Sequence, residues 1–230
     1  MKKTPLLLLD AGHGRGCPNG SPDGALQEWR QARICAALLA AHVQAAGVDV
    51  QLLAPGPEDV ALNQRCRTAN YWHKRYADTC DALLVSLHLN AYGDGRTWTQ
   101  PRGLRVYVAP RASAASLRAA GEVLQACREH TSEARGGAPA QMALEARRGN
   151  FAIVRDTTAP AMLVELGFMT NAADAALLSS PDYLDELSRL TSPGALRVLG
   201  RPCLRRGAPP PPPPARKKVN KVNKVNGELH

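Results

Sequence analysis

The sequence predicts an α/β fold: a single domain with a mostly parallel sheet flanked by helices, followed by a disordered C-terminal tail. The chain has 230 residues, of which 44% are hydrophobic and 21% charged, enough for a buried core and ordinary for a globular protein. Short apolar runs alternate with helical patterns up to about residue 190, and this alternation implies crossovers between parallel strands. Because the composition then changes, we expect a domain at residues 1–200 and a tail at 201–230.

The first expected strand is the apolar run at residues 5–9. A loop rich in Gly, Pro, Asn and Asp follows at 10–24, and then a helix at 26–46 that stops at Gly47. The helical side chains expected to face the core recur at i, i+4, i+7 and i+11: Ile34, Leu38, Ala41 and Ala45. Further elements alternate in the same way, with strands expected at 48–53, 82–87, 103–109 and 161–166, and helices at 58–77, 112–133, 172–178 and 181–190.

The tail is a low-complexity segment. Six prolines run from Pro209 to Pro214, and three Lys-Val-Asn units occupy Lys218 to Asn226, with too little apolar surface to fold alone. The tail holds eight basic residues and one acid, so it carries +7 of the formal charge of +9 and the first 200 residues carry +2. The near-neutral body argues against a nucleic-acid binder. The tail is expected to contact an anionic wall polymer or membrane surface.

The N-terminus looks like the start of a secretory signal, because Met1-Lys-Lys precedes the four leucines Leu6 to Leu9. A signal needs an apolar stretch of about 7–15 residues, and this run ends at Asp10. We therefore expect a buried strand, and a monomeric protein synthesised in the cytoplasm without a signal peptide. No apolar run approaches the roughly 20 residues of a transmembrane helix.

Three potential metal ligands stand at the ends of predicted elements. His13 follows the first strand, Glu28 begins the first long helix, and His88 ends the strand at 82–87. Ligands gather outside the carboxyl ends of parallel strands, so these side chains are expected to converge. Two histidines and one glutamate, with a fourth position open to water, form a known catalytic zinc set. The sequence therefore predicts a site for one Zn²⁺ ion.

Glu165 is the expected catalytic residue. It ends an otherwise apolar strand, where a carboxylate is costly to bury without a partner. Beside an activated water, it can take that water's proton and pass it to a leaving amine. Asp10 and Asn90 are candidates for hydrogen bonds that orient the ligands. A Gly-x-Ser-x-Gly elbow is absent, which weakens a serine acyl-enzyme mechanism.

These segments resemble the zinc-dependent N-acetylmuramoyl-L-alanine amidases of the amidase-3 type. The resemblance covers about residues 5–190 and rests on five segments: Leu9–Gly14, Gln27-Glu28, Arg65–Asn70, Ser86–Ala91 and Pro160–Asn171. It implies a twisted sheet of about six strands, with His13, Glu28 and His88 as zinc ligands and Glu165 as the catalytic glutamate. It also implies hydrolysis of the amide between N-acetylmuramic acid and L-alanine in peptidoglycan.

The chain departs from the family at Arg15, where glycine is usual, and at Trp29, where a charged residue is usual. A single domain without an export signal favours a phage or prophage endolysin, a bacteriolytic enzyme that reaches the cell wall or periplasm after release. Two alternatives stay open: a zinc peptidase that cuts within the stem peptide, and a wall-binding module without activity.

Overall fold

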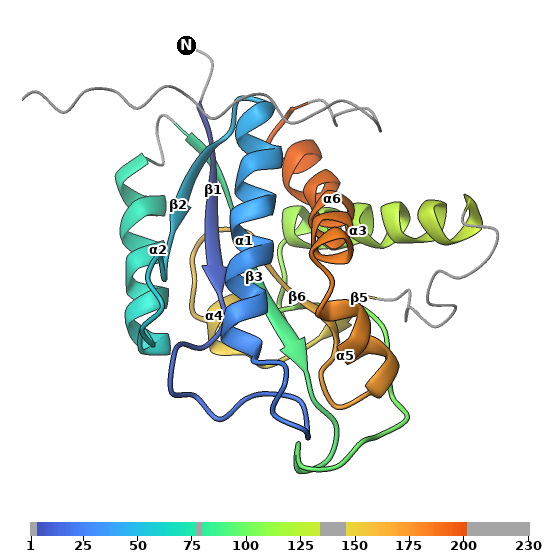
Figure 1. Cartoon of the computed structure of the whole chain (residues 1–230). Helices are drawn as coiled ribbons and strands as arrows, with labels where there is room; N and C mark the ends of the chain where they lie inside the picture. Colours follow the sequence, from blue (N-terminus) through green and yellow to red (C-terminus); the bar gives the residue numbers. More distant parts are fainter. Residues whose placement is uncertain (1–3, 77–79, 134–145, 202–230) are drawn as a thin grey trace, which may run out of the picture.

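The computed structural model describes residues 4–76, 80–133 and 146–201, and within them one six-stranded sheet is formed (Figure 1). The strands are β1 (Thr4–Ala11), β2 (Asp49–Leu52), β3 (Cys80–Asn90), β4 (Arg105–Val108), β5 (Ala146–Arg148) and β6 (Ala161–Phe168). Their order is β2-β1-β3-β6-β4-β5. The first four strands of this order are parallel, whereas β4 runs antiparallel to β6 and β5 parallel to β4. The predicted α/β fold with a mostly parallel sheet is confirmed.

Helices cover both faces of the sheet. One face packs under α1 (Glu28–Ala45), α3 (Ala114–Glu133), α5 (Ala172–Leu178) and α6 (Pro181–Val198), and Figure 1 shows α1 and α6 side by side. The other face packs under α2 (Leu62–Tyr76) and α4 (Ala152–Arg155). The leucine run of β1 alternates between the two cores, which explains why a strand in this position is apolar throughout.

The predicted core face of the first helix is wrong at Ile34 and Ala41, whereas Leu38 is half-buried and packs against the core. Ile34 is 39% exposed and Ala41 is exposed, whereas the helix buries a different stripe that includes Ala32, Cys35 and Leu39. The helix is rich in alanine, so its faces differ little in hydrophobicity. Small side chains on the buried stripe allow α1 to pack between the sheet and α6, and this packing decides the face.

Two short elements, β5 and α4, were not predicted. They span three and four residues, too few to show a periodicity. Helix α6 also extends beyond its predicted end at residue 190. It continues to Val198 and includes Pro193 within it. At Gly194 a Cβ atom would lie 2.6 Å from the main-chain oxygen of Ala119, so glycine is required where α6 crosses α3.

The expected tail, residues 201–230, lies outside the described residues except for Arg201. Its predicted disorder and surface contacts stay predictions. Among the described helices, none combines the length and hydrophobicity that crossing a membrane would require.

Candidate metal and catalytic site

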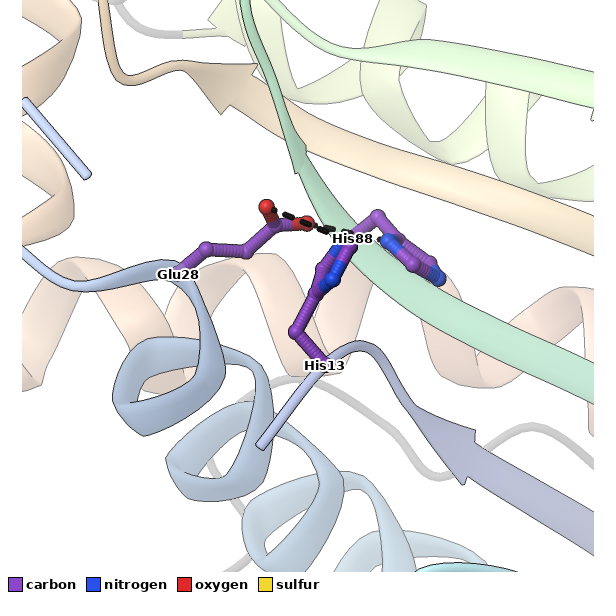
Figure 2. Close-up of side chains that lie close together, drawn as sticks. All are labelled: His13, Glu28 and His88. Carbon is purple, nitrogen blue, oxygen red and sulfur yellow. Dashed lines mark hydrogen bonds and ion pairs between the residues drawn. The ribbon is translucent and has the colours of Figure 1, made fainter. Parts of the chain in front are cut away.

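The three predicted metal ligands come together at the carboxyl edge of the parallel strands. His13 lies two residues beyond the end of β1, Glu28 begins α1, and His88 lies near the end of β3. Figure 2 shows the Glu28 carboxylate directed toward the two imidazole rings. One potential ligand atom from each residue lies within 4.8 Å of the others. The predicted convergence of these three side chains is therefore present in the structure.

The motif Gly12-His13-Gly14 is explained by close packing. A Cβ atom at Gly12 would lie 2.4 Å from the ring of His88, and one at Gly14 would lie 2.1 Å from the backbone of Asp59. His13 itself adopts a left-handed conformation with φ of 55°, the one such non-glycine residue in the described chain. A conformation of this kind costs about 1–3 kcal/mol and is found most often at functional sites.

Glu28 is buried and held from three sides. Its Oε1 accepts hydrogen bonds from His88 Nδ1 at 2.9 Å and from the Leu89 amide at 3.0 Å, and its Oε2 accepts one from Asn19 Nδ2 at 3.1 Å. Burial alone would raise the pKa of Glu28, but the hydrogen bond and charge of His88, with a further contribution from His13, hold that pKa below its usual value. The lowered pKa favours the ionised carboxylate, the form in which Glu28 could bind a metal ion.

The pKa values of the two histidines are shifted in opposite directions, although burial lowers both. Burial lowers the pKa of His13, which favours the neutral imidazole that a metal requires. Burial would also lower the pKa of His88, but the hydrogen bond to Glu28 and the charges of Glu165 and Glu28 raise it.

Asn19 lies against the same ligand atoms, and sequence reasoning missed it. Its side-chain nitrogen is 3.2 Å from His13 Nε2 and 3.1 Å from Glu28 Oε2, so one amide donates toward two of the three ligands. The Glu28 amide donates to the main-chain oxygen of Asn19, which fixes the loop beside α1. The segment Pro18-Asn19-Gly20 indicates only a turn, and no signal in it shows where the amide points.

Glu165 lies next to His88 on the neighbouring strand, because the two residues are partners in the β3–β6 register. It is 8% exposed, and its Oε2 is buried without a hydrogen-bond partner in the described chain. Burial raises the pKa of Glu165 to about 7; His88 opposes this rise, and the negative charge of Glu28 adds to it. A carboxyl with this pKa can both accept and donate a proton near neutral pH.

One cavity of about 360 Å³ joins the three ligands and Glu165. Apolar side chains cover much of its wall, among them Leu62, Phe151, Ile153 and Met169. Two of these belong to the region of α4, which was not predicted and which packs on the same face of the sheet as α2. The apolar wall is the physical cause of the desolvation at Glu165.

The two residues expected to orient the ligands lie nearby but contact other groups. Asp10 is fully buried and accepts hydrogen bonds from Ser86 Oγ at 2.7 Å and Arg65 Nη1 at 3.3 Å. It thereby holds Arg65, which lines the cavity. Asn90 also lines the cavity, and its main-chain oxygen accepts from the Met169 amide at 2.8 Å. The described hydrogen bonds of both residues go to groups other than the three ligands.

The two departures from the family pattern lie outside the cavity wall. Arg15 is 3.5 Å from the Glu58 carboxylate, and the Trp29 indole donates to Gln27 Oε1 at 2.9 Å. Neither contact involves a ligand atom. His42 is buried and pairs with Asp185 at 2.9 Å, and it does not belong to the cluster of His13, Glu28 and His88.

The fold and these residues define a class of metal-dependent hydrolase. The chain belongs to the Amidase_3 family of N-acetylmuramoyl-L-alanine amidases, whose family model matches residues 7–195. The segments that suggested this family in the sequence lie within the match.

Two curated relatives are similar over most of this chain. The N-acetylmuramoyl-L-alanine amidase CwlM of Bacillus licheniformis is 26% identical over 195 residues, which are 84% of this chain and 68% of CwlM. A sporulation-specific N-acetylmuramoyl-L-alanine amidase of Bacillus subtilis (strain 168) is 23% identical over 184 residues, 80% of this chain and 64% of the relative. The chain thus spans about two thirds of the length of these proteins.

A solved structure supports the fold. The N-acetylmuramoyl-L-alanine amidase from Clostridium difficile 630 aligns with a TM-score of 0.69 and 24% identity, covering 86% of this chain and 98% of that one. At this identity the likeness concerns the fold alone.

Proposed function

We propose that this protein is a zinc-dependent N-acetylmuramoyl-L-alanine amidase that hydrolyses the bond between N-acetylmuramic acid and L-alanine in peptidoglycan. The observation that carries the proposal is the convergence of His13, Glu28 and His88 on a cavity that Glu165 also lines, next to His88 and with a carboxylate oxygen that has no described hydrogen-bond partner. Membership of the amidase family supports the choice of the scissile bond.

The donor set fits zinc. Two imidazole nitrogens and one carboxylate oxygen suit Zn²⁺, whereas Ca²⁺ and Mg²⁺ prefer oxygen ligands throughout. The Asn19 amide supports the fit, because its N–H donors are directed at lone pairs that a cation would use. When bound, zinc would polarise the scissile carbonyl and lower the pKa of a water in the open position to about 7.

Glu165 would perform the proton transfers. Its carboxylate accepts the proton of the attacking water, and the resulting carboxylic acid then donates that proton to the departing alanine nitrogen. Both steps need a group that can exchange a proton at working pH, and burial favours this by raising the pKa of Glu165 to about 7 in the metal-free protein. The apolar side chains around the cavity maintain this pKa by keeping bulk water away from Glu165.

Digestion of purified sacculi with the zinc-loaded protein tests the proposal, with products identified by mass spectrometry. We expect free stem peptides that begin with alanine, and we expect a chelator to abolish them. Fragments cut within the stem would instead establish the peptidase alternative. A zinc-loaded protein that binds sacculi and releases nothing would establish the wall-binding alternative.

We further propose that residues 1–200 form the catalytic domain and that the basic segment 201–230 holds it at anionic wall or membrane surfaces. The separation of charge between body and tail supports this division. Deleting residues 205–230 should weaken lysis of cells more than cleavage of soluble muropeptides. Equal losses on both substrates would contradict it.

The endolysin setting is tested by expression in a bacterial host with and without a holin. Lysis that requires the holin is expected for an endolysin. Lysis without the holin would contradict it.

A further inference from the structure

Three polar side chains on three adjacent strands form a row across the sheet. His88 of β3 is the register partner of Glu165 in β6, and Glu165 is the register partner of Arg105 in β4. Side chains of directly paired residues share one face of a sheet, with Cβ atoms about 4.5–5.5 Å apart in antiparallel pairs. The next pair, Val106 and Val164, belongs to the core under α1, so Arg105 and Glu165 point to the opposite face of the sheet. Glu165 lines the cavity on that face, and Arg105 lies one strand beyond it, outside the cavity lining.

A second row brings another arginine to the same face. Tyr107 of β4 pairs with Leu163 of β6 on one side and with Arg147 of β5 on the other. Leu163 and Tyr107 belong to the core under α2 and α4, which fixes the face of Arg147 as that of Glu165. The positive charge of Arg147 contributes, after burial, to lowering the pKa of Arg105, so the two cations are close enough to repel each other.

Neither cation forms a described salt bridge, although the negative charge of Asp174 acts on Arg105 and raises its pKa against the larger lowering effects of burial and Arg147. Arg105 Nη1 donates to the main-chain oxygens of Gly103 and Leu104 at 3.3 and 3.1 Å, and its guanidinium carbon lies 5.3 Å from the Phe168 ring centroid. Within the described residues, neither Arg105 nor Arg147 forms an ion pair with a carboxylate. Two guanidinium groups that approach each other on one face favour a carboxylate ligand, whose oxygens match their N–H donors.

The order of His88, Glu165 and Arg105 across the strands indicates in which direction the substrate peptide would run. His88 belongs to the side of the cavity where the scissile carbonyl would lie, and Glu165 would protonate the departing nitrogen. The chain beyond that nitrogen therefore continues past Glu165 toward β4 and β5. Neighbouring strands are about 4.8 Å apart and an extended peptide advances about 3.3 Å per residue, so the arginines are reached within roughly one to three residues.

We propose that Arg105 and Arg147 form a carboxylate-binding subsite for the acidic stem peptide on the leaving-group side of the scissile amide. The subsite rests on the proposed amidase function and adds to it a preference for substrates with a free carboxylate within the first three stem residues. Arg105 and Arg147 would set this preference by binding, without taking part in proton transfer.

The test compares two soluble muramyl peptides that differ at one group of the second stem residue. In one substrate this residue carries a free carboxylate, and in the other the same group is a carboxamide. The wild-type protein should cleave the carboxylate form with a kcat/KM about tenfold higher or more, as expected for a charge-assisted hydrogen bond. The variant R105Q/R147Q should lose this preference mainly through a higher KM for the carboxylate form. The charge reversal R147E provides a second variant at an exposed strand position and should invert the preference.

Arg148 is the matched control. It is the next residue of the same strand, but it projects to the other face, and its Nη1 donates to the main-chain oxygen of Pro110 at 2.6 Å. The variant R148Q should keep the wild-type preference. Loss of preference in R148Q, or equal losses on both substrates in R105Q/R147Q, would overturn the subsite.

Binding of the free acidic stem peptide, measured by calorimetry on the zinc-loaded protein, separates the subsite from the proposed function. Binding that depends on the two arginines, in a protein that cleaves no muramyl amide, would contradict the amidase proposal and support the subsite. Cleavage of both substrates without discrimination would support the amidase proposal and overturn the subsite.

Discussion

Glu28 and Glu165 are both buried on the wall of one cavity, yet their surroundings move their pKa values in opposite directions. Hydrogen bonds from His88, Leu89 and Asn19 surround Glu28, and the pKa of Glu28 is lowered. Glu165 faces apolar side chains and has an unpartnered oxygen, and its pKa is raised to about 7. The surroundings thus keep Glu28 ionised, whereas they allow Glu165 to exchange a proton near neutral pH.

The largest effect is expected for E165Q. Glutamine keeps the size of the side chain but cannot exchange the proton, so the turnover of sacculi should fall by at least about 100-fold, the lower end for a general base. Zinc content, measured by atomic absorption, should match that of the wild type. An E165Q protein that is zinc-loaded and active would show that Glu165 is not the proton-transfer group.

The variant E28Q tests the other glutamate of the pair. The amide removes the negative charge that the cluster supplies, so zinc affinity should fall by roughly 100-fold, at or beyond the upper end seen for losing an outer partner of a ligand. Activity measured against zinc concentration should recover in excess metal for E28Q, whereas E165Q should stay inactive. Equal responses of the two variants to zinc would remove the distinction between the two glutamates.

The raised pKa of Glu165 should also appear in the stability of the zinc-free protein. With an unfolded pKa of 4.5 and a folded pKa of about 7, the folded state holds more protons between these values, so stability falls as pH rises through this window. Above pH 7 the loss reaches about 3 kcal/mol. The free energy of unfolding, measured with urea at pH 5 and pH 8, should be more favourable to E165Q relative to wild type at pH 8 than at pH 5. If the difference in free energy between the two proteins is the same at both pH values, the pKa assignment is contradicted.

The smallest effect is expected for N19A. The Asn19 amide competes with a cation for His13 Nε2 and Glu28 Oε2, and its removal should tighten zinc binding by about fivefold, the value of one hydrogen bond of about 1 kcal/mol. Competition with a chromophoric chelator measures this change. Weaker zinc binding in N19A would show that the amide instead supports the metal-bound form of the site.

The elements that position the site could be predicted because their signals are local. His13 follows β1 and His88 lies near the end of β3, in or next to apolar runs typical of buried strands, and Glu28 starts a long helix. Glu165 was expected at the end of its strand but lies within β6, which continues to Phe168. Parallel strands bring such ends to one edge, so the convergence of the three ligands followed from topology.

The unpredicted features depend on contacts between distant segments. The direction of the Asn19 amide is set by a loop that runs beside α1, and the exposure of Ile34 is set by the packing of α1 between sheet and α6. The arginines of the proposed subsite lie on β4 and β5, and their common face appears only once the register with β6 is known.

Crystals of the zinc-loaded protein, measured on both sides of the zinc absorption edge, test the central claim most directly. We expect one anomalous peak bound by His13, Glu28 and His88 at about 2.0–2.2 Å, with Glu165 facing the remaining position from outside bonding distance. A peak that lacks any of these three residues, or one that Glu165 itself coordinates in place of a histidine, would contradict the account.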